Sequence, residues 1–137
     1  MKQKNGMLKL KDLADITVRP WNPGMRSDSG RFPYIGLKGE GGFCDTANFD
    51  ADSIIVTRFG SGSGRVFYFS EPGYASGCIV LRGKTPDGTR FLYRYLKKRA
   101  CPQASVSPGS SVPQITVKAA ENFKIDIPFM NGMNSRP

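Results

Sequence analysis

The chain contains no histidine, few acidic residues and only three cysteines, and none of its hydrophobic runs approaches the roughly 20 residues of a membrane-spanning helix. Without histidine, Ser/His/Asp triads, Cys/His dyads and histidine-ligated metal sites are excluded. The 11 acidic residues are scattered, and no carboxylate pair suited to general acid–base chemistry is visible. We therefore expect no enzymatic activity, no metal and no cofactor, although carboxylate or Ser–Lys chemistry stays formally open.

The cysteines, Cys44, Cys78 and Cys101, are odd in number and widely spaced, so neither a zinc finger nor a CxxC site is available. We expect reduced thiols, buried or incidental, in a cytoplasmic protein. The N-terminal sequence MKQKNGMLKLKD is basic but lacks the apolar segment of a secretory signal.

The sequence is rich in basic residues and in the turn-forming residues glycine and proline. The 137 residues suit a single domain, 1–137, and 16 glycines with 10 prolines favour a β-rich fold with many loops. The net charge of +9 indicates a polyanionic partner, with nucleic acid ahead of an anionic membrane surface. A basic protein without such a partner is the open alternative.

The chain is organised around a central stretch, residues 53–84. Ser53–Arg58 is predicted to form a buried strand, Gly60–Gly64 a tight turn, Arg65–Phe69 the returning strand and Gly77–Leu81 a further strand. Glycines in such a turn let backbone N–H groups approach an anion, and arginines flank the turn. An ordinary hairpin loop is the alternative.

The segment before the central stretch is expected to begin with frayed residues 1–7. The elements expected after them are a short helix at Leu8–Ala14, a strand at Ile16–Val18, a loop at Pro20–Gly30, a strand at Phe32–Leu37, a glycine-rich turn at Lys38–Phe43 and a polar connection at Asp45–Asp52. The turn at 38–43 lacks the GK[ST] of a Walker loop. Trp21, inside the predicted loop, either anchors the loop to the core or stacks on a base.

A helix from Pro86 to about Arg99 should follow, with Thr85 as its N-cap. One face carries the apolar stripe Phe91, Leu92, Tyr95 and Leu96, and the other carries Arg90, Arg94, Lys97 and Lys98. The basic face is either simply solvated or contacts phosphates. The elements expected beyond it are a loop at Cys101–Ser111, a helix at Val117–Glu121 capped by Thr116, a strand over 123–127 and a tail at Phe129–Pro137.

The ordered set of segments resembles the target-recognition domain of type I restriction-modification specificity subunits over roughly residues 8–128. The segments that carry the resemblance are KLKDLADI, PYIGLKGEGG, NFDADSIIVTRFGSGSGRV, YASGCIVLRG, FLYRYLKK and GSSVPQITVKAAENFKIDIP.

The resemblance implies an α+β fold with a curved, mostly antiparallel sheet, and non-catalytic, sequence-specific binding of double-stranded DNA. In that family a subunit carries two such domains, each reading half of a bipartite target, separated by long helices that dock methyltransferase subunits. This sequence holds one such domain and ends in FMNGMNSRP where the family continues into a spacer helix. It is therefore interpreted as one domain of a longer subunit, a split half-subunit used with a second specificity chain, or a stand-alone protein.

Candidate DNA-binding residues follow from charge and hydrogen-bonding capacity. Candidate phosphate contacts are Lys38, Arg58, Arg65, Lys84, Arg90, Arg94, Lys97 and Lys98. Candidate base contacts are Ser61, Ser63, Arg65 and Gln114. The alternative for Gln114 is that its amide satisfies backbone groups in a loop.

Two other functions stay open. The domain could act as an interaction module that docks on methyltransferase or specificity subunits without reading DNA. A carboxylate-based nuclease is the weakest hypothesis, because no clustered Asp/Glu pair is visible in the sequence. We expect no association with a membrane.

Overall fold

The computed structural model describes residues 7–36, 39–60, 63–98 and 114–126. Some expectations fall on other residues and lie outside this description, namely Lys38, Ser61, Cys101, the loop at 101–111, Ile127 and the tail at 129–137. Within the described ranges, no helix is long and apolar enough to cross a membrane.

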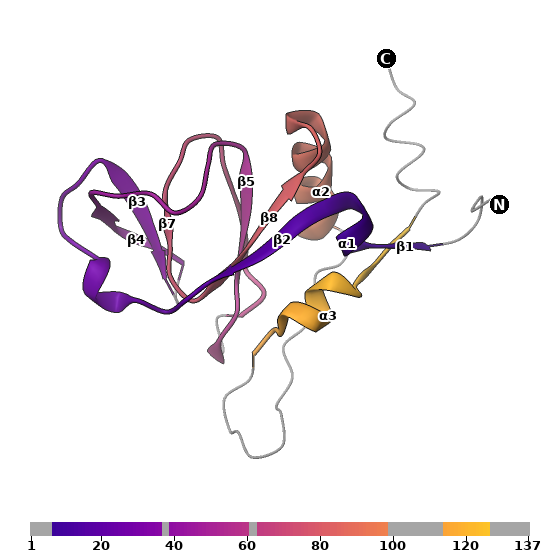
Figure 1. Cartoon of the computed structure of the whole chain (residues 1–137), viewed down its shortest axis with the longest axis horizontal. Coiled ribbons are helices and arrows are strands. Elements are labelled where there is room, and N and C mark those ends of the chain that lie inside the picture. The colour runs from indigo at the N-terminus through magenta and orange to yellow at the C-terminus, as the bar shows by residue number, and fades with distance from the viewer. Residues whose placement is uncertain (1–6, 37–38, 61–62, 99–113, 127–137) are drawn as a thin grey trace.

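A four-stranded antiparallel sheet lies at the centre of the molecule (Figure 1). Its strands, in spatial order, are β2 (Ala14–Arg19), β8 (Cys78–Gly83), β5 (Ser53–Thr57) and β6 (Val66–Phe69). β5 is rich in β-branched residues and is buried along its whole length, because strands flank it on both sides and side chains cover both of its faces. The predicted central hairpin is confirmed as the β5–β6 pair.

The other strands form two smaller sheets. β3 (Phe32–Gly36) lies between the antiparallel β4 (Gly39–Cys44) and the parallel β7 (Tyr74–Ala75), and β1 (Met7–Lys9) pairs antiparallel with β9 (Lys124–Asp126). The expected α+β class with mostly antiparallel strands is confirmed. The strands are divided among three sheets, however, instead of forming one curved sheet.

The structure corrects the expectations for the segment at 38–43 and for Met7. The glycine-rich segment at 38–43 was expected to turn, but from Gly39 onward it is strand β4, because its backbone pairs with β3. Positive φ angles at Gly39 (101°) and Gly42 (91°) accompany an irregular register in that pair, a conformation that glycine accepts readily. The expected fraying of residues 1–7 is wrong at Met7, which pairs with Asp126.

The helices are short apart from one. They are α1 (Leu10–Leu13), the 3₁₀ turn η1 (Pro23–Met25), α2 (Pro86–Lys98) and α3 (Val117–Glu121). α1 is shorter than the expected Leu8–Ala14, because Leu8 belongs to β1 and Ala14 to β2.

Two threonines cap helices as predicted. The backbone N–H of Gly88 donates to Thr85 Oγ1 over 2.9 Å, and that of Ala119 donates to Thr116 Oγ1 over 3.0 Å. Each hydroxyl satisfies an amide that has no partner inside the helix, which explains why α2 and α3 begin where they do.

Because successive side chains of a strand point to opposite faces, the apolar residues of the central sheet pack into two cores. On one face, residues of β5 and β8 pack against the predicted apolar stripe of α2: Ile54, Val56, Ile79, Leu81, Phe91, Leu92, Tyr95 and Leu96. On the other face, Ile55, Val80 and Cys78 pack with Ile35, Phe49 and Ala75. The second core contains no residue of β2. On that face, side chains of β2 instead line the groove described below.

Two of the three cysteines can be placed. Cys44 and Cys78 are buried free thiols, as expected. Burial of Cys78 raises the pKa of its thiol to about 12, because the low-polarity interior disfavours the thiolate.

Candidate nucleic-acid interface

The structure brings together two of the predicted contacts, Arg58 and Gln114. Arg58 Nη2 donates to Gln114 Oε1 over 3.2 Å, and Arg58 Nε donates to the carbonyl oxygen of Ile115 over 2.9 Å. The backbone N–H of Ile115 returns a bond to the carbonyl oxygen of Arg58 at 2.9 Å. Partial burial lowers the pKa of Arg58 from its usual value. The guanidinium therefore fastens the segment leading into α3 to the end of β5.

The turn after β5 is tight, as predicted. The N–H of Ser63 donates to the carbonyl oxygen of Gly60 over 3.1 Å, and the N–H of Gly64 donates to that of Thr57 over 2.8 Å. Gly60 and Gly64 have φ angles of 73° and 84°, which side chains rarely tolerate. Arg65 is exposed where the chain returns into β6.

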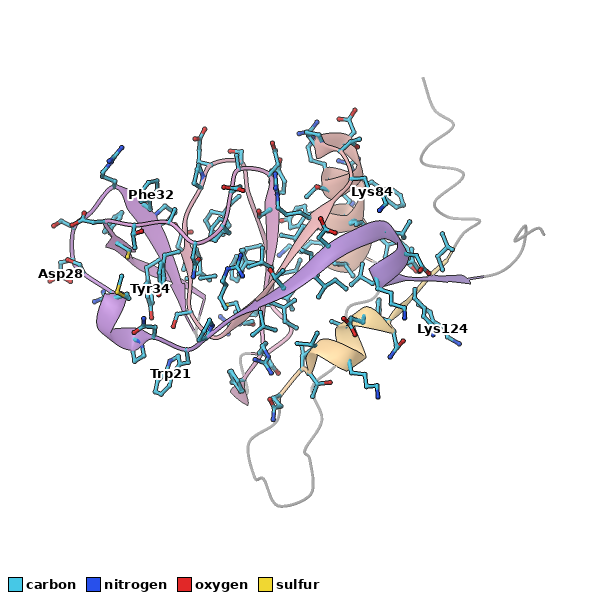
Figure 2. All side chains as sticks on the ribbon, in the orientation of Figure 1. Trp21, Asp28, Phe32, Tyr34, Lys84 and Lys124 are labelled. Carbon is cyan, nitrogen blue, oxygen red and sulfur yellow. The ribbon has the colours of Figure 1, made fainter. Side chains whose placement is uncertain are left out.

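A second group of predicted cations lies on and beside α2. Arg94, Lys97 and Lys98 are exposed on this helix, and Lys84 is exposed just before it (Figure 2). α2 and α3, whose leading segment the Arg58 contacts hold, both contribute buried side chains to the first core. The predicted cations therefore lie in two groups by element, one at the turn after β5 and one on and beside α2.

Arg90 differs from its neighbours on α2 because it is engaged within the protein. Its guanidinium is bonded to the Asp87 carboxylate and lies 3.6 Å from that of Asp52. The Tyr68 hydroxyl also donates to Asp52, and this bond raises the pKa of Tyr68. Part of the positive charge of Arg90 is therefore compensated internally.

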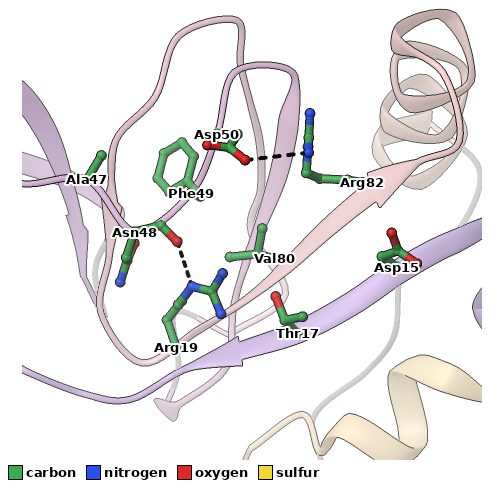
Figure 3. Close-up of a pocket in the computed structure, with 9 residues that line it drawn as sticks. All are labelled: Asp15, Thr17, Arg19, Ala47, Asn48, Phe49, Asp50, Val80 and Arg82. Atoms are coloured by element: carbon green, nitrogen blue, oxygen red, sulfur yellow. Dashed lines mark hydrogen bonds and ion pairs between the residues drawn. The ribbon is translucent and has the colours of Figure 1, made fainter.

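A polar groove of about 440 Å³, which the sequence reasoning missed, lies beside the second core (Figure 3). Its floor is formed by β2 and β8 and its rim by the segment before β5. The residues that line it are Asp15, Thr17, Arg19, Ala47, Asn48, Phe49, Asp50, Val80 and Arg82. The alternation of Asp15, Thr17 and Arg19 with apolar residues is the sequence signal that could have identified it.

The arginines of the groove are held by backbone carbonyl groups. Arg19 Nε donates to the carbonyl oxygen of Asn48 over 2.7 Å, and Arg82 Nη2 donates to that of Ala51 over 3.1 Å. Arg82 also lies 3.7 Å from the carboxylate of Asp50. A guanidinium carries five N–H donors, so both arginines keep donors for a ligand.

The rim of the groove is itself fixed. The Asn48 side chain donates to the carbonyl oxygen of Ala75 over 2.8 Å and accepts from the N–H of Ala75 over 2.7 Å. Phe49 and Gly73 form an isolated antiparallel bridge. A Cβ at Gly73 would come within 2.4 Å of the Phe49 ring, so glycine is required for this approach. The groove is therefore preformed.

Trp21 is exposed to 60% at the lower edge of the molecule, so the interpretation that it anchors its loop to the core is wrong (Figure 2). The adjacent residue holds the backbone instead: the N–H of Asn22 donates to Ser76 Oγ over 2.7 Å, and its carbonyl oxygen accepts from the Tyr34 hydroxyl over 3.3 Å. The Trp21 side chain is therefore exposed to solvent on a loop whose backbone is held by these two hydrogen bonds.

A family model described as the type I restriction modification DNA specificity domain matches residues 2–132. The crystal structure of a type I restriction-modification S subunit from M. genitalium is similar, with a TM-score of 0.67 and 18% identity, over 91% of this chain and 35% of that one. A structure reported for complex assembly and conformational transition of the type I R-M system has a TM-score of 0.66 and 13% identity, over 97% and 37% of the two chains. The chain thus spans about a third of the solved structures' length. The search of curated proteins found no match.

Proposed function

This chain belongs to the type I restriction modification DNA specificity domain family, and we propose that it binds double-stranded DNA in a sequence-specific manner. It reads one half of a bipartite target for a restriction-modification complex. The observation that carries this proposal is the family match, which extends over residues 2–132. The shared fold with two type I structures supports it, as does the net charge of +9.

The two groups of exposed cations have a defined role in this proposal. In the proposed complex, the exposed cationic side chains contact phosphates of the DNA. Such contacts supply affinity and orientation but carry no sequence information. We assign this role to Arg65, Lys84, Arg94, Lys97 and Lys98, and retain Lys38 from the sequence. Arg90 is a weaker candidate because two carboxylates compensate its charge.

The sequence suggested base contacts in and near the turn after β5. We retain only some of these residues as candidate base contacts. Ser63 and Arg65 stay candidates at the turn, and Ser61 stays a candidate from the sequence. The amide oxygen of Gln114 is already bonded to Arg58, so we assign these two residues mainly to holding the segment before α3.

Selection from a random duplex DNA library tests the function. The purified chain is used at low and at near-physiological salt. Enrichment of a short fixed motif that survives the higher salt supports the proposal and identifies the half-site. Binding that shows no motif and disappears as salt rises contradicts it, because only the sequence-independent electrostatic attraction is then present.

We propose that the domain catalyses nothing itself, acts in the cytoplasm and works with methyltransferase subunits, with a second specificity chain reading the other half-site. The family match supports this assembly, as does the similarity to a structure reported for complex assembly of the type I R-M system.

A docking module that does not read DNA is the second candidate, favoured by the exposure of Trp21 (60%) and Phe43 (44%). Stable co-purification with a methyltransferase, lost in Trp21→Ala, with no DNA motif selected, would support it.

A further inference from the structure

We propose that the groove between β2, β8 and the 47–50 segment is the base-reading site of the domain, and that it recognises a G·C base pair in the major groove of duplex DNA. This inference rests on the proposed DNA-binding function. It moves the principal base contacts away from the turn after β5, where the sequence had suggested them.

The central pair of the site is Asp15 and Arg82. They are cross-strand partners on β2 and β8, so their side chains leave the same face of the sheet next to each other. Arg82 nevertheless turns toward Asp50, which lies 3.7 Å away, and toward the carbonyl oxygen of Ala51 (Figure 3). The Asp15 carboxylate is exposed and makes no hydrogen bond or ion pair with any residue that the structure describes.

The charges that line the groove distinguish a base from a phosphate. Arg19 and Arg82 are balanced there by Asp15 and Asp50, in a chain with 20 basic and only 11 acidic residues. Two carboxylates would repel a phosphate, whereas the edge of a base pair presents hydrogen-bond donors as well as acceptors. The exposed face of α2, with Arg94, Lys97 and Lys98, has the purely cationic character expected of a phosphate contact.

The donor and acceptor pattern selects the G·C pair. In the major groove, guanine presents two acceptors, N7 and O6, and the paired cytosine presents the N4 amino donor. The free donors of Arg82 or Arg19 match guanine, and the unpaired carboxylate of Asp15 matches cytosine. An A·T pair would place the methyl group and O4 of thymine where Asp15 needs a donor, so it would be rejected.

The groove also meets the mechanical requirement of direct readout. Its floor consists of paired strands, and backbone carbonyl groups orient its arginines. Between the two ends lies the cross-strand pair Thr17 and Val80. Val80 is buried in the second core, whereas Thr17 is exposed and its methyl group offers an apolar contact to a neighbouring base. Binding therefore requires little reorganisation of the protein.

The test uses the full 137-residue chain and the duplex motif obtained by library selection, with affinities measured by fluorescence anisotropy. Asp15→Asn should reduce the preference for the motif over a duplex with one G·C pair replaced by A·T, by about five- to 150-fold. The matched control is Glu71→Gln, an exposed position outside the groove with the same change in charge. It should leave the preference unchanged.

A second measurement changes the DNA and begins with the wild-type chain. Replacing the motif's guanine by 7-deazaguanine removes the N7 acceptor and should weaken wild-type binding about tenfold or more. Arg82→Ala should be insensitive to this replacement if Arg82 makes the contact, and Arg19→Ala if Arg19 does.

The outcomes separate the two proposals. A motif whose preference is unchanged by Asp15→Asn, and whose 7-deazaguanine sensitivity survives in both arginine variants, overturns the groove assignment and leaves the DNA-binding function standing. A wild-type chain that selects no motif overturns both.

Discussion

At the scale of single residues, Arg58 shows how a side chain that looks like a ligand contact can be a structural one. Its guanidinium is bonded to the backbone of Ile115 and to the side chain of Gln114. These partners lie far from Arg58 in the sequence, so neither contact could be anticipated from a local pattern. Arg58 should therefore contribute to stability more than to affinity.

Arg58→Ala should lower the free energy of unfolding by about 1–2 kcal/mol, because the buried carbonyl oxygen of Ile115 loses a charged donor. Arg94→Ala, exposed on α2, should change it by less than about 0.5 kcal/mol. Urea denaturation measures both. Equal stability of the two variants, with reduced DNA affinity for Arg58→Ala, would restore Arg58 as a DNA contact.

Cys78 provides a prediction about pH. Its pKa is raised to about 12 in the folded protein, against 9.0 for an ordinary thiol, because burial penalises the thiolate. Between those two values the unfolded chain releases a proton that the folded chain retains, so stability should fall as pH rises. The fall approaches about 1.4 kcal/mol per pH unit for one proton.

Urea denaturation at pH 8, 9, 10 and 10.5 isolates this effect if the wild type is compared with Cys78→Ala. The wild type should lose stability faster than the variant above pH 9, although the variant is less stable at pH 8 because of the cavity it creates. Parallel pH dependences in the two proteins would mean that Cys78 titrates normally.

At the scale of elements, capping accounts for the boundaries that local sequence predicted well. Thr116→Ala removes the hydroxyl that accepts from the N–H of Ala119, and should cost about 1 kcal/mol of stability. Thr116→Ser should retain most of it, because the hydroxyl remains. A thermal melt that shows no difference between the Ala and Ser variants would exclude a capping role.

The outer face of α2 should act on all DNA sequences alike. Lys98→Ala should weaken binding to the selected motif and to a scrambled duplex by the same factor, and reduce the slope of log affinity against log salt by about 0.9. Titrations at several salt concentrations measure this slope. A loss confined to the motif would instead place α2 against the bases.

Local patterns predicted the β5–β6 hairpin, α2 with its apolar stripe, and both threonine caps, because each depends on neighbours within a few residues. Strand β4 was not predictable, because its glycines disfavour a strand and only pairing with β3 imposes one. The groove was missed for the same reason. The alternation of β2 is visible in the sequence, but the pairing of Asp15 with Arg82 depends on sheet register.

At the scale of the whole molecule, the fold separates two surfaces with different chemistry. The central sheet carries α2 on one face, with its cations directed outward, and the groove with its balanced charges on the other. β1 and β9 join the beginning and the end of the described chain. If these surfaces have the proposed roles, variants on α2 should alter affinity and variants in the groove should alter specificity.

The most direct test of the central claim is the ratio of the affinities for the selected motif and for a scrambled duplex of the same composition, at about 0.15 M salt. At this ionic strength the Debye length is about 8 Å, so long-range attraction is largely screened and base contacts decide the difference. Sequence-specific recognition predicts that the motif binds at least about tenfold more tightly, since each mismatched base pair costs about 1–3 kcal/mol. Equal affinities that decline together with salt would contradict it.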